Sequence, residues 1–299
     1  MNNKWLLWII LGGASLMFFL LTLYALILYT EREEDLGDFS FSGNKIGVID
    51  LVGPIYEARP TVEQLRKFGE NPGIKAIILR MDSPGGGVAA SQEIYTEVLR
   101  VREKKHKIVV ASMASVGASG AYYIACACDK IMANPGSVTG SIGVIAEWYN
   151  YGELLKWAKL KSVVFKSGEL KDAPSPVREL TESEKKYLQN IIDDLYSQFI
   201  TAVSKGRKLD LETVKRLSDG RIFTGADAKA KKLIDETGGL YDAVDLTAKL
   251  AKISGEPKLV HPPRERRTLI DLLTGDLSGL LSFPQGIQDR RIQFSFLWK

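Results

Sequence analysis

Ser119 lies in a run of small residues, Ser-Val-Gly-Ala-Ser-Gly-Ala, followed directly by Tyr-Tyr-Ile. Small neighbours leave room for a substrate beside a serine hydroxyl, and the chemistry that such a hydroxyl performs is nucleophilic acyl transfer. A serine needs a neighbouring base to take its proton, most often histidine. The chain has two histidines, and we expect neither to serve, because His106 lies among lysines between two elements and His261 lies in a Pro-rich segment near the end.

A lysine is the remaining candidate base, a variant of the same catalytic logic. A free lysine has a pKa of about 10.4, so a lysine base near neutral pH needs this value lowered by roughly three units, or about 4 kcal/mol. Burial beside an apolar substrate lowers a lysine pKa in this way. Lys171 stands out because it lies in a polar loop and not on a helix face. Its acidic neighbours Glu169 and Asp172 argue against it, since acidic partners raise a lysine pKa.

Glycines near both strand ends could stabilise an oxyanion, because their backbone N–H groups are not shielded by side chains. One donor could come from Gly85-Gly86-Gly87, which follows a buried strand, and a second from Gly120. The alternative for the triplet is a tight turn that uses glycine for positive φ. A phosphate-binding loop is disfavoured because the Gly-Lys-Ser/Thr ending is missing.

No cofactor or metal is expected. The only cysteines, Cys126 and Cys128, lie in an apolar run without the further ligands that a zinc site requires. We interpret them as small buried side chains. The formal net charge of +4 is small, and basic residues alternate with acidic ones, so a nucleic-acid partner is not expected.

The elements that must position these residues alternate between apolar strands and amphipathic helices. This alternation predicts an α/β fold with a largely parallel sheet, in which function lies at strand ends. A capping box of Thr181 and Glu184 begins the longest predicted helix. The predicted strands are 45–56, 74–83 and 107–115. The predicted helices are 61–69, 89–105, 180–208 and segments of 219–235 and 238–252. Residues 157–176 are predicted to form a helix end, a strand and a polar loop.

Residues 5–30 carry no charged side chain and are long enough to cross a bilayer. We therefore predict a cytoplasmic N-terminus at 1–4, a transmembrane anchor at 5–30, a linker at 31–44, a catalytic body at 45–256 and a tail at 257–299. Lys4 before the span and acidic residues after it place the body outside the cytoplasmic membrane. The alternative for 5–30 is a buried core helix. The tail ends in Phe294, Phe296, Leu297 and Trp298, which could dock on the body, on a neighbouring subunit or on the bilayer.

Five segments in order carry a resemblance to a known family. They are DSPGGG (82–87), SVGASGAYYIA (115–125), SVTGSIGV (137–144), KSGELKDAPSP (166–176) and DGRIFTGADA (219–228). The chain resembles the signal peptide peptidase A family, serine–lysine peptidases of the Clp protease/crotonase superfold, whose fold is a spiral of β-β-α units. The resemblance implies that Ser119 is the nucleophile and Lys171 the general base, with Lys166 as its rival. It also suggests Gly86 as an oxyanion donor beside Gly120, and Ser141 as a hydrogen-bond partner of the lysine amine.

The family resemblance further implies a homo-octamer in which adjacent subunits contribute the serine and the lysine. We expect a membrane-anchored serine endopeptidase that degrades remnant signal peptides and other extended hydrophobic peptides outside the cytoplasmic membrane. One alternative is a crotonase-type acyl-CoA enzyme, which would need an acidic catalytic residue near the glycines. Two others are a non-catalytic membrane scaffold and a membrane protease of the same superfold with a specific protein substrate.

Overall fold

The computed structural model describes residues 12, 13, 15–19, 21, 22, 44–262 and 294–298, in two units, 1–42 and 43–299. In the first unit the described residues are helical, and the side chains of Leu16, Met17 and Phe18 are exposed. Among the described residues, no helix combines the length and the apolar character needed to cross a membrane. Most of the predicted anchor, all of residues 1–4 and residues 31–43 of the predicted linker lie outside the described residues.

The second unit is built on a mostly parallel sheet of eight strands, which runs in the order β10-β1-β2-β4-β5-β9. Strand β6 continues the sheet beside the end of β4, and β8 pairs antiparallel with β6. A smaller sheet has the order β3-β11-β7. The strands are β1 (Lys45–Val52), β2 (Ile74–Ser83), β3 (Gly85–Gly87), β4 (Ile108–Ala118), β5 (Lys130–Ala133), β6 (Val138–Gly140), β7 (Ile145–Ala146), β8 (Ile222–Thr224), β9 (Glu236–Thr237), β10 (Lys258–Val260) and β11 (Phe294–Leu297).

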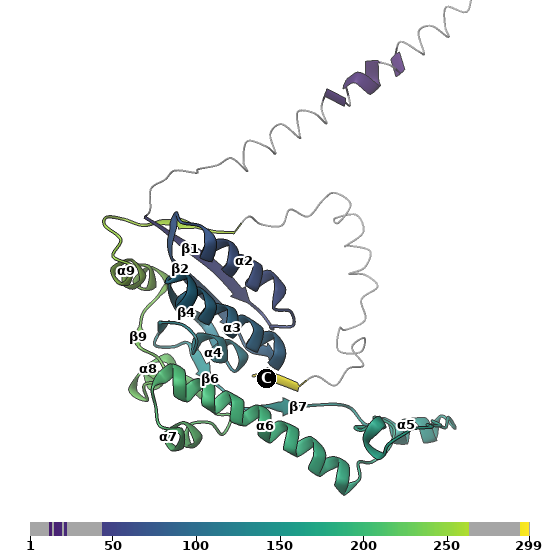
Figure 1. The fold of residues 1–299 in the computed structure, drawn as a ribbon. Helices are drawn as coiled ribbons and strands as arrows, with labels where there is room; N and C mark the ends of the chain where they lie inside the picture. The colour runs from purple at the N-terminus through teal and green to yellow at the C-terminus, as the bar shows by residue number, and fades with distance from the viewer. Residues whose placement is uncertain (1–11, 14, 20, 23–43, 263–293, 299) are drawn as a thin grey trace, which may run out of the picture. The chain divides into compact units, whose positions relative to one another are not determined.

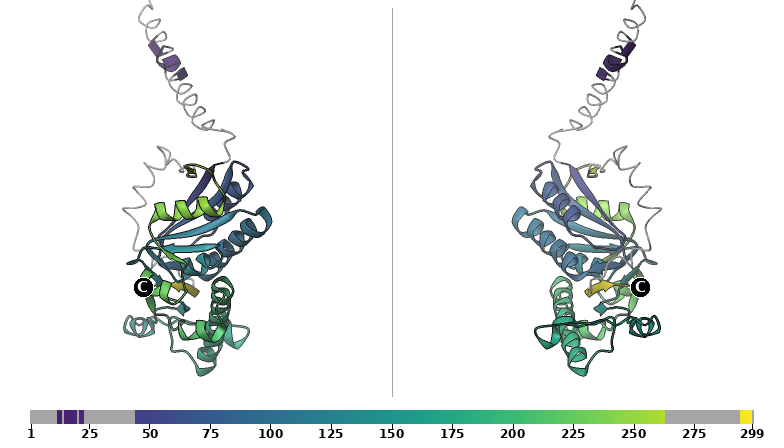
Figure 2. Two further views of the ribbon diagram at one scale, coloured as in Figure 1. Left: turned by 90° about the vertical axis from the view of Figure 1, so that its left-hand side faces the viewer. Right: turned by 90° about the vertical axis from the view of Figure 1, so that its right-hand side faces the viewer.

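Helices cover both faces of the main sheet. The helices are α2 (Arg59–Glu70), α3 (Val88–Lys105), α4 (Gly120–Ala125), α5 (Gly152–Trp157), the 3₁₀ turn η1 (Glu169–Asp172), α6 (Glu182–Arg207), α7 (Leu211–Arg216), α8 (Gly225–Ala230) and α9 (Leu240–Leu250). Helices α2, α3 and α4 lie on one face and α9 on the other, while α6 extends away from the sheet toward α5 (Figures 1 and 2).

Alternation along strand β2 explains this layering, because successive strand side chains point to opposite faces. Ile77 and Leu79 pack in the cluster that contains the α2 and α3 side chains. Ile78, between them, packs with Val244 and Ala248 of α9. Because both faces are buried, β2 has the nearly continuous apolar sequence that is typical of a parallel-sheet strand.

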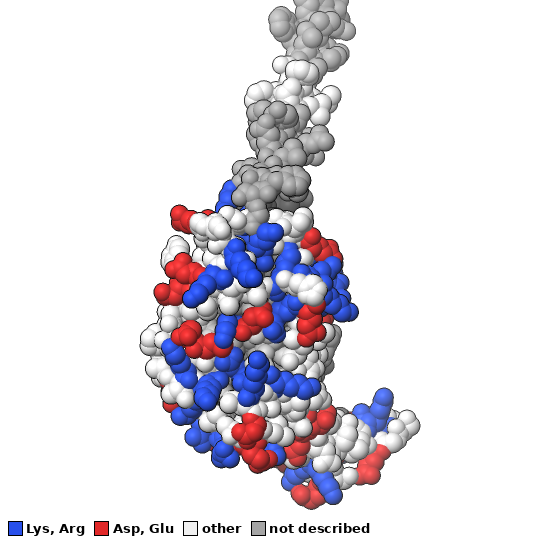
Figure 3. All heavy atoms as spheres, turned by 60° about the vertical axis from the view of Figure 1, so that its left-hand side comes forward, with Lys and Arg blue, Asp and Glu red and all other residues white. Residues whose placement is uncertain are grey.

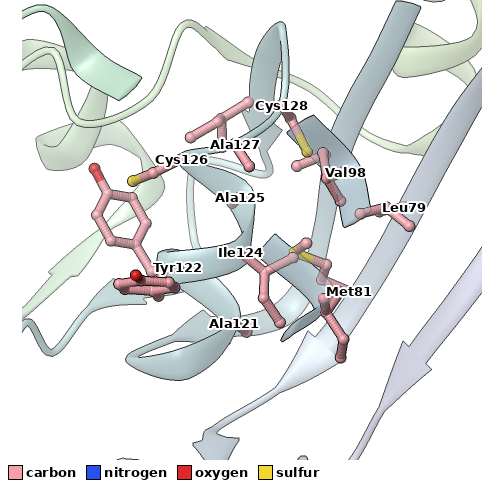
Figure 4. Packing of buried hydrophobic residues seen from close by; sticks show 14 of the residues in the cluster. Leu79, Met81, Val98, Ala121, Tyr122, Ile124, Ala125, Cys126, Ala127 and Cys128 are labelled. Atoms are coloured by element: carbon pink, nitrogen blue, oxygen red, sulfur yellow. The ribbon is translucent and has the colours of Figure 1, made fainter. Parts of the chain in front are cut away.

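Helix α4 follows the end of strand β4 and is packed in the core. All its residues are buried, and the Tyr122 hydroxyl donates a hydrogen bond of 2.8 Å to the Leu233 carbonyl. Figure 4 shows the helix packed with Leu79, Met81 and the two cysteines. This packing fixes the position of the residue that precedes the helix, Ser119.

The predicted α/β class and parallel sheet are confirmed. Strand 74–83 has the predicted bounds, and the capping box of Thr181 and Glu184 begins α6 as predicted. The strand predicted within 157–176 is wrong, because the described segment contains only the end of α5 and the turn η1. Acidic and basic side chains are interspersed over the face drawn in Figure 3.

Candidate active site

Ser119 lies at the junction between β4 and α4. Its backbone has φ 52° and ψ −114°, a conformation that non-glycine residues rarely adopt. The Ser119 N–H donates to the Gly140 carbonyl at 2.8 Å, and only 1% of the residue is exposed. Strained backbone of this kind persists where surrounding structure imposes it, and it is concentrated at catalytic and ligand sites.

Ser141 occupies the matching position on the neighbouring strand. Because Ala118 pairs with Gly140 in the parallel register of β4 and β6, the residues that follow them, Ser119 and Ser141, leave the sheet at the same edge. Ser141 also has a positive φ, 50°, and its N–H donates to the Arg221 carbonyl at 2.8 Å. The structure therefore brings two of the predicted site residues together.

The glycine turn brings a third predicted residue to Ser119. A Cβ on Gly120 would lie 3.1 Å from the Gly86 nitrogen, so the two glycines are in close contact. Gly85 has a φ of 98°, which favours glycine, and this conformation directs the turn across the start of α4. The triplet therefore combines a glycine with positive φ, Gly85, and a glycine in close contact with Gly120, Gly86. A tight turn and an oxyanion donor are compatible interpretations of it.

Two backbone N–H groups are candidates for an oxyanion hole. The Ser119 N–H is already used by Gly140, whereas the Gly120 N–H is in the first turn of α4 and has no partner within the helix. On β3, Ile55 uses the Gly85 carbonyl and the Gly87 N–H, each at 2.8 Å. Backbone N–H and C=O groups alternate between the two edges of a strand, so the Gly86 N–H points to the edge of β3 that faces β11 and not Ile55. The predicted donors Gly86 and Gly120 are therefore positioned as a pair.

A cleft of about 520 Å³ opens beside Ser119 and Ser141. Its lining combines apolar side chains with hydroxyl and carboxylate groups. The lining residues are Ser119, Ser141, Gly143, Val144, Ile145, Ile192, Asp193, Tyr196, Ser218, Asp219, Gly220, Leu297 and Trp298. Among the described residues, neither histidine lines it, and both histidines are exposed elsewhere on the body.

Lys171 is exposed on η1 and is not among the residues that line this cleft. Its rival Lys166 is engaged, because its Nζ contacts an Asp172 carboxylate oxygen at 2.6 Å. The two basic partners Lys166 and Arg178 hold the pKa of Asp172 below its ordinary value through hydrogen bonds. Among the described residues, the Lys171 ammonium makes no ion pair or side-chain hydrogen bond. In the described part of the chain, Lys171 therefore does not share the cleft that Ser119 lines.

The two cysteines are buried beneath the site. Burial raises the pKa of the Cys126 thiol to about 12 and the pKa of Cys128 still further. At neutral pH both side chains are uncharged thiols, which are poor nucleophiles. Their predicted role as small buried residues is confirmed, and Ser119 remains the candidate nucleophile of this region.

An exposed apolar segment precedes Lys171 in the chain, and sequence reasoning missed it. We name it the apolar arm, residues 149–165. Trp157 is 82% exposed and Phe165 95% exposed, whereas large aromatic side chains are usually at least partly buried. The apolar run Val163-Val164-Phe165 was the available signal, but it also fits a buried strand.

Residues 101–254 match the family described as peptidase family S49, and this range includes Ser119, Ser141 and Lys171. The chain belongs to this family. An S49 relative from Synechocystis, named "Putative protease slr0021", is 42% identical over 244 residues, which cover 81% of this chain and 87% of that protein.

Other relatives of this S49 chain have related names. The Enterococcus faecium protein "Putative signal peptide peptidase SppA" is 38% identical over 199 residues, 67% of this chain and 58% of that protein. "Protease 4" of Salmonella typhi is 32% identical over 264 residues, 83% of this chain and 41% of that protein. The S49 chain is therefore a serine protease of the signal peptide peptidase A type. These names do not favour the acyl-CoA or scaffold alternatives.

Proposed function

We propose that this S49 protease is a membrane-anchored serine endopeptidase that uses Ser119 and Lys171 as a catalytic dyad. Its substrates would be extended hydrophobic peptides, including remnant signal peptides. The observation that carries the proposal is that Ser119 lines the cleft with Ser141, and that Gly120, the residue directly after Ser119, packs against the Gly86 nitrogen. This is the arrangement that acyl transfer requires.

In the proposed reaction, the neutral amine of Lys171 takes the Ser119 proton as the hydroxyl oxygen attacks the substrate carbonyl. The Gly86 and Gly120 N–H groups bind the resulting oxyanion. The lysine ammonium then gives its proton to the leaving amine, and the C–N bond breaks to leave an acyl-serine. Water then gives a proton to the same amine and attacks this ester. The ester C–O bond breaks, the ammonium returns the proton to the Ser119 oxygen, and the acid and the free hydroxyl are released.

We propose that Lys171 reaches the Ser119 of a neighbouring copy. The support is that Lys171 is exposed and unpaired among the described residues, while Lys166 is held by Asp172. Insertion beside an apolar substrate would desolvate the ammonium and favour its neutral form. A single copy would then hold an incomplete site.

The apolar arm supplies a reason for copies to associate. Its exposed side chains would be buried in an interface, and removal of apolar surface from water stabilises association. We propose that the copies form a homo-octamer of Clp protease/crotonase-like spiral subunits. The segment that follows each arm would carry Lys171 to the next subunit in the ring.

We propose that residues 5–30 anchor the protein, with the catalytic body outside the cytoplasmic membrane. The support is the uncharged sequence of this segment and the basic residue before it. An enzyme tethered at this place would meet apolar peptides left in the bilayer after signal cleavage. Extended peptides can be held by strand addition, which leaves alternate side chains for apolar pockets.

A complementation experiment tests the shared dyad. Full-length wild type, Ser119→Ala, Lys171→Ala and an equimolar coassembly of the two variants would be assayed on a hydrophobic peptide. Lys166→Ala is the matched control, because it removes an amine from the same segment. We expect each dyad variant to lose turnover, the mixture to recover part of it, and Lys166→Ala to keep most of it.

Three outcomes would each overturn part of the proposal. Full activity of Ser119→Ala would exclude Ser119 as the nucleophile. Loss of turnover in Lys166→Ala but not in Lys171→Ala would identify Lys166 as the general base. If the mixture recovers nothing although native mass spectrometry shows mixed assemblies, the dyad lies within one chain and the shared site is wrong.

A further inference from the structure

The guanidinium of Arg178 joins the turn that carries Lys171 to the first turn of α6. Its Nη2 donates to an Asp172 carboxylate oxygen at 3.0 Å and to a Glu184 carboxylate oxygen at 2.6 Å. Its Nη1 donates to the second Glu184 oxygen at 2.8 Å. Asp172 ends η1 directly after Lys171, and Glu184 lies in the first turn of α6. The planar fork of an arginine suits contact with two carboxylates, whereas the point charge of a lysine does not reproduce it.

Both carboxylates that contact Arg178 have a further partner. The other Asp172 oxygen accepts from Lys166 Nζ at 2.6 Å, and this Nζ also donates to the Glu169 carbonyl at 2.7 Å. The Glu184 carboxylate accepts from the Thr181 N–H at 2.8 Å as part of the capping box. Only 1% of Glu184 is exposed, so this end of the network is fixed in the protein. We name the network the ionic bridge, residues Lys166, Asp172, Arg178 and Glu184.

The ionic bridge contains two cations and two carboxylates, so its charges balance. Hydrogen bonds, first from Lys166 and then from Arg178, hold the pKa of Asp172 below its ordinary value. The Asp172 carboxylate is therefore ionised at neutral pH, but each of its oxygens accepts from a cation. An unbalanced carboxylate within a few ångströms of a lysine favours the ammonium form. The acidic neighbour that argued against Lys171 in the sequence is thus engaged by other residues.

Helix α6 connects the ionic bridge to the cleft. Glu184 lies in its first turn, and further along the same uninterrupted helix Ile192 lines the cleft beside Ser119. At about 1.5 Å per residue, these two positions are about 12 Å apart along the helix axis. The bridge therefore fixes η1 to an element of the cleft wall. In the proposed ring, the start of α6 sets where Lys171 is presented to the neighbouring copy.

We propose that Arg178 is a positioning residue for Lys171, which ties η1 to α6 and balances the charge of the Asp172 carboxylate beside the amine. The inference rests on the proposed function of Lys171 as the general base and adds the group that keeps this base competent. Loss of the guanidinium leaves Lys166 as the remaining cation of the bridge for two carboxylates. The Lys171 amine would then hold its proton more strongly.

Kinetic pH profiles of the full-length protein test this role. Arg178→Met and Arg178→Lys would each be measured alone and combined with Asp172→Asn. We expect the acid limb of the kcat profile to move up by about one pH unit in Arg178→Met, which is about a tenfold loss of kcat below the midpoint. Asp172→Asn should return the limb to its wild-type position, because Lys166 then faces one carboxylate.

Arg178→Lys covers the case in which Arg178→Met does not fold. It keeps one cation for the buried Glu184 carboxylate but lacks the fork that also reaches Asp172, so its limb should move in the same direction and be restored by Asp172→Asn. Lys166→Ala should move the limb less than either variant, because the guanidinium still contacts both carboxylates.

Lys185→Met is the matched control. Lys185 is a cation of the first turns of α6, but its ion pair is with the exposed Glu182 and not with Asp172. We expect its pH profile to match the wild type. A fall in kcat of Arg178→Met without movement of the limb, or a limb that Asp172→Asn does not restore, overturns the charge-balancing role. Wild-type kinetics in both Arg178 variants overturn the inference as a whole.

A spectroscopic titration separates the inference from the proposed function. Lysines would be methylated with isotope-labelled formaldehyde, and the Lys171 resonance would be assigned by its absence from Lys171→Arg. We expect its titration midpoint to rise in Arg178→Met and to return with Asp172→Asn. If these shifts occur but Lys171→Ala keeps full turnover, the dyad fails and the role of Arg178 in balancing charge survives. If Lys171→Ala abolishes turnover but the midpoint does not move, the inference fails and the dyad survives.

Discussion

Ser119 and Ser141 follow two parallel-paired strands at the same edge of the sheet, and each has a positive φ, 52° and 50° respectively. The two residues line one cleft. Their backbones are tied together, because the Ser119 N–H donates to the carbonyl of Gly140, the residue before Ser141. The edge of the sheet therefore sets the separation of the two hydroxyls, and movement of one strand end would be transmitted to the other.

Substitution of Ser141 by Ala should lower kcat more than it raises KM. A hydroxyl that orients the lysine amine contributes about 1.5 kcal/mol through its hydrogen bond, which corresponds to about tenfold in kcat. The alkaline and acid limbs of the kcat profile should also shift, because the partner of the amine has changed. Steady-state kinetics from about pH 6 to about pH 10 measure both effects.

Ser218→Ala is the control for this experiment. Ser218 lines the same cleft, but its hydroxyl donates to the Val214 carbonyl at 2.7 Å and so has a partner within its own segment. We expect its pH profile to match the wild type. An unchanged profile for Ser141→Ala would assign Ser141 a purely structural role.

Gly85→Ala should abolish most of the activity without unfolding the sheet. The added Cβ would lie 2.1 Å from the Phe296 carbonyl oxygen and 2.6 Å from the Gly120 nitrogen, and the φ of 98° is unfavourable for alanine. Displacement of one oxyanion donor costs about 10²–10³ in kcat. The control is Gly143→Ala, which lines the cleft but whose Cβ would find its nearest neighbour at 3.6 Å. Comparable kcat values for the two variants would argue against the glycine amides as catalytic donors.

The main sheet and the residues at its edge could be predicted because their signals are local. The apolar run 74–83 is buried on both faces, and the capping box joins residues three positions apart. Ser119 and Gly120 were recognisable because the run of small residues is itself the feature that allows close packing with Gly86. Sequence patterns of this kind report on near neighbours.

Other features depend on contacts that no local pattern contains. The pairing of β11 with β3 joins residues about two hundred positions apart, so the tail could be assigned several docking places but not this one. The run Val163-Val164-Phe165 favoured a strand, yet the described chain offers it no partner strand and leaves Phe165 exposed. Strand propensity is realised only when side chains find a surface to pack against.

The start of helix α6 should be sensitive to acid through Glu184. Hydrogen bonds from Arg178, and then from the Thr181 backbone, lower the pKa of Glu184 from 4.5 to about 2. A carboxyl with a lowered pKa contributes stability that is complete above 4.5 and is lost as pH falls through about 2. Urea unfolding of Glu184→Gln and wild type should therefore differ most at neutral pH and converge as the pH falls through this window.

Glu182→Gln provides the comparison for the acid experiment. Glu182 is on the same turn but is exposed, and it forms an ion pair with Lys185, three residues away. Exposed pairs of this kind contribute little to stability. A Glu184→Gln difference that stays constant from neutral pH to pH 2 would mean that loss of packing, and not loss of the carboxylate, causes the effect.

Phe165→Asp should disperse the assembly while leaving the fold of each subunit intact. Phe165 is 95% exposed in the single chain, so the substitution removes no internal contact, but a charge at a buried interface would have to be desolvated. We expect sedimentation to show smaller species, circular dichroism to be unchanged, and turnover to fall with the loss of Lys171 from neighbouring sites. Tyr241→Asp is the control, since Tyr241 is 78% exposed on α9, away from the apolar arm. Intact assemblies with full turnover in Phe165→Asp would show that the arm is not the contact that brings Lys171 to a neighbouring subunit.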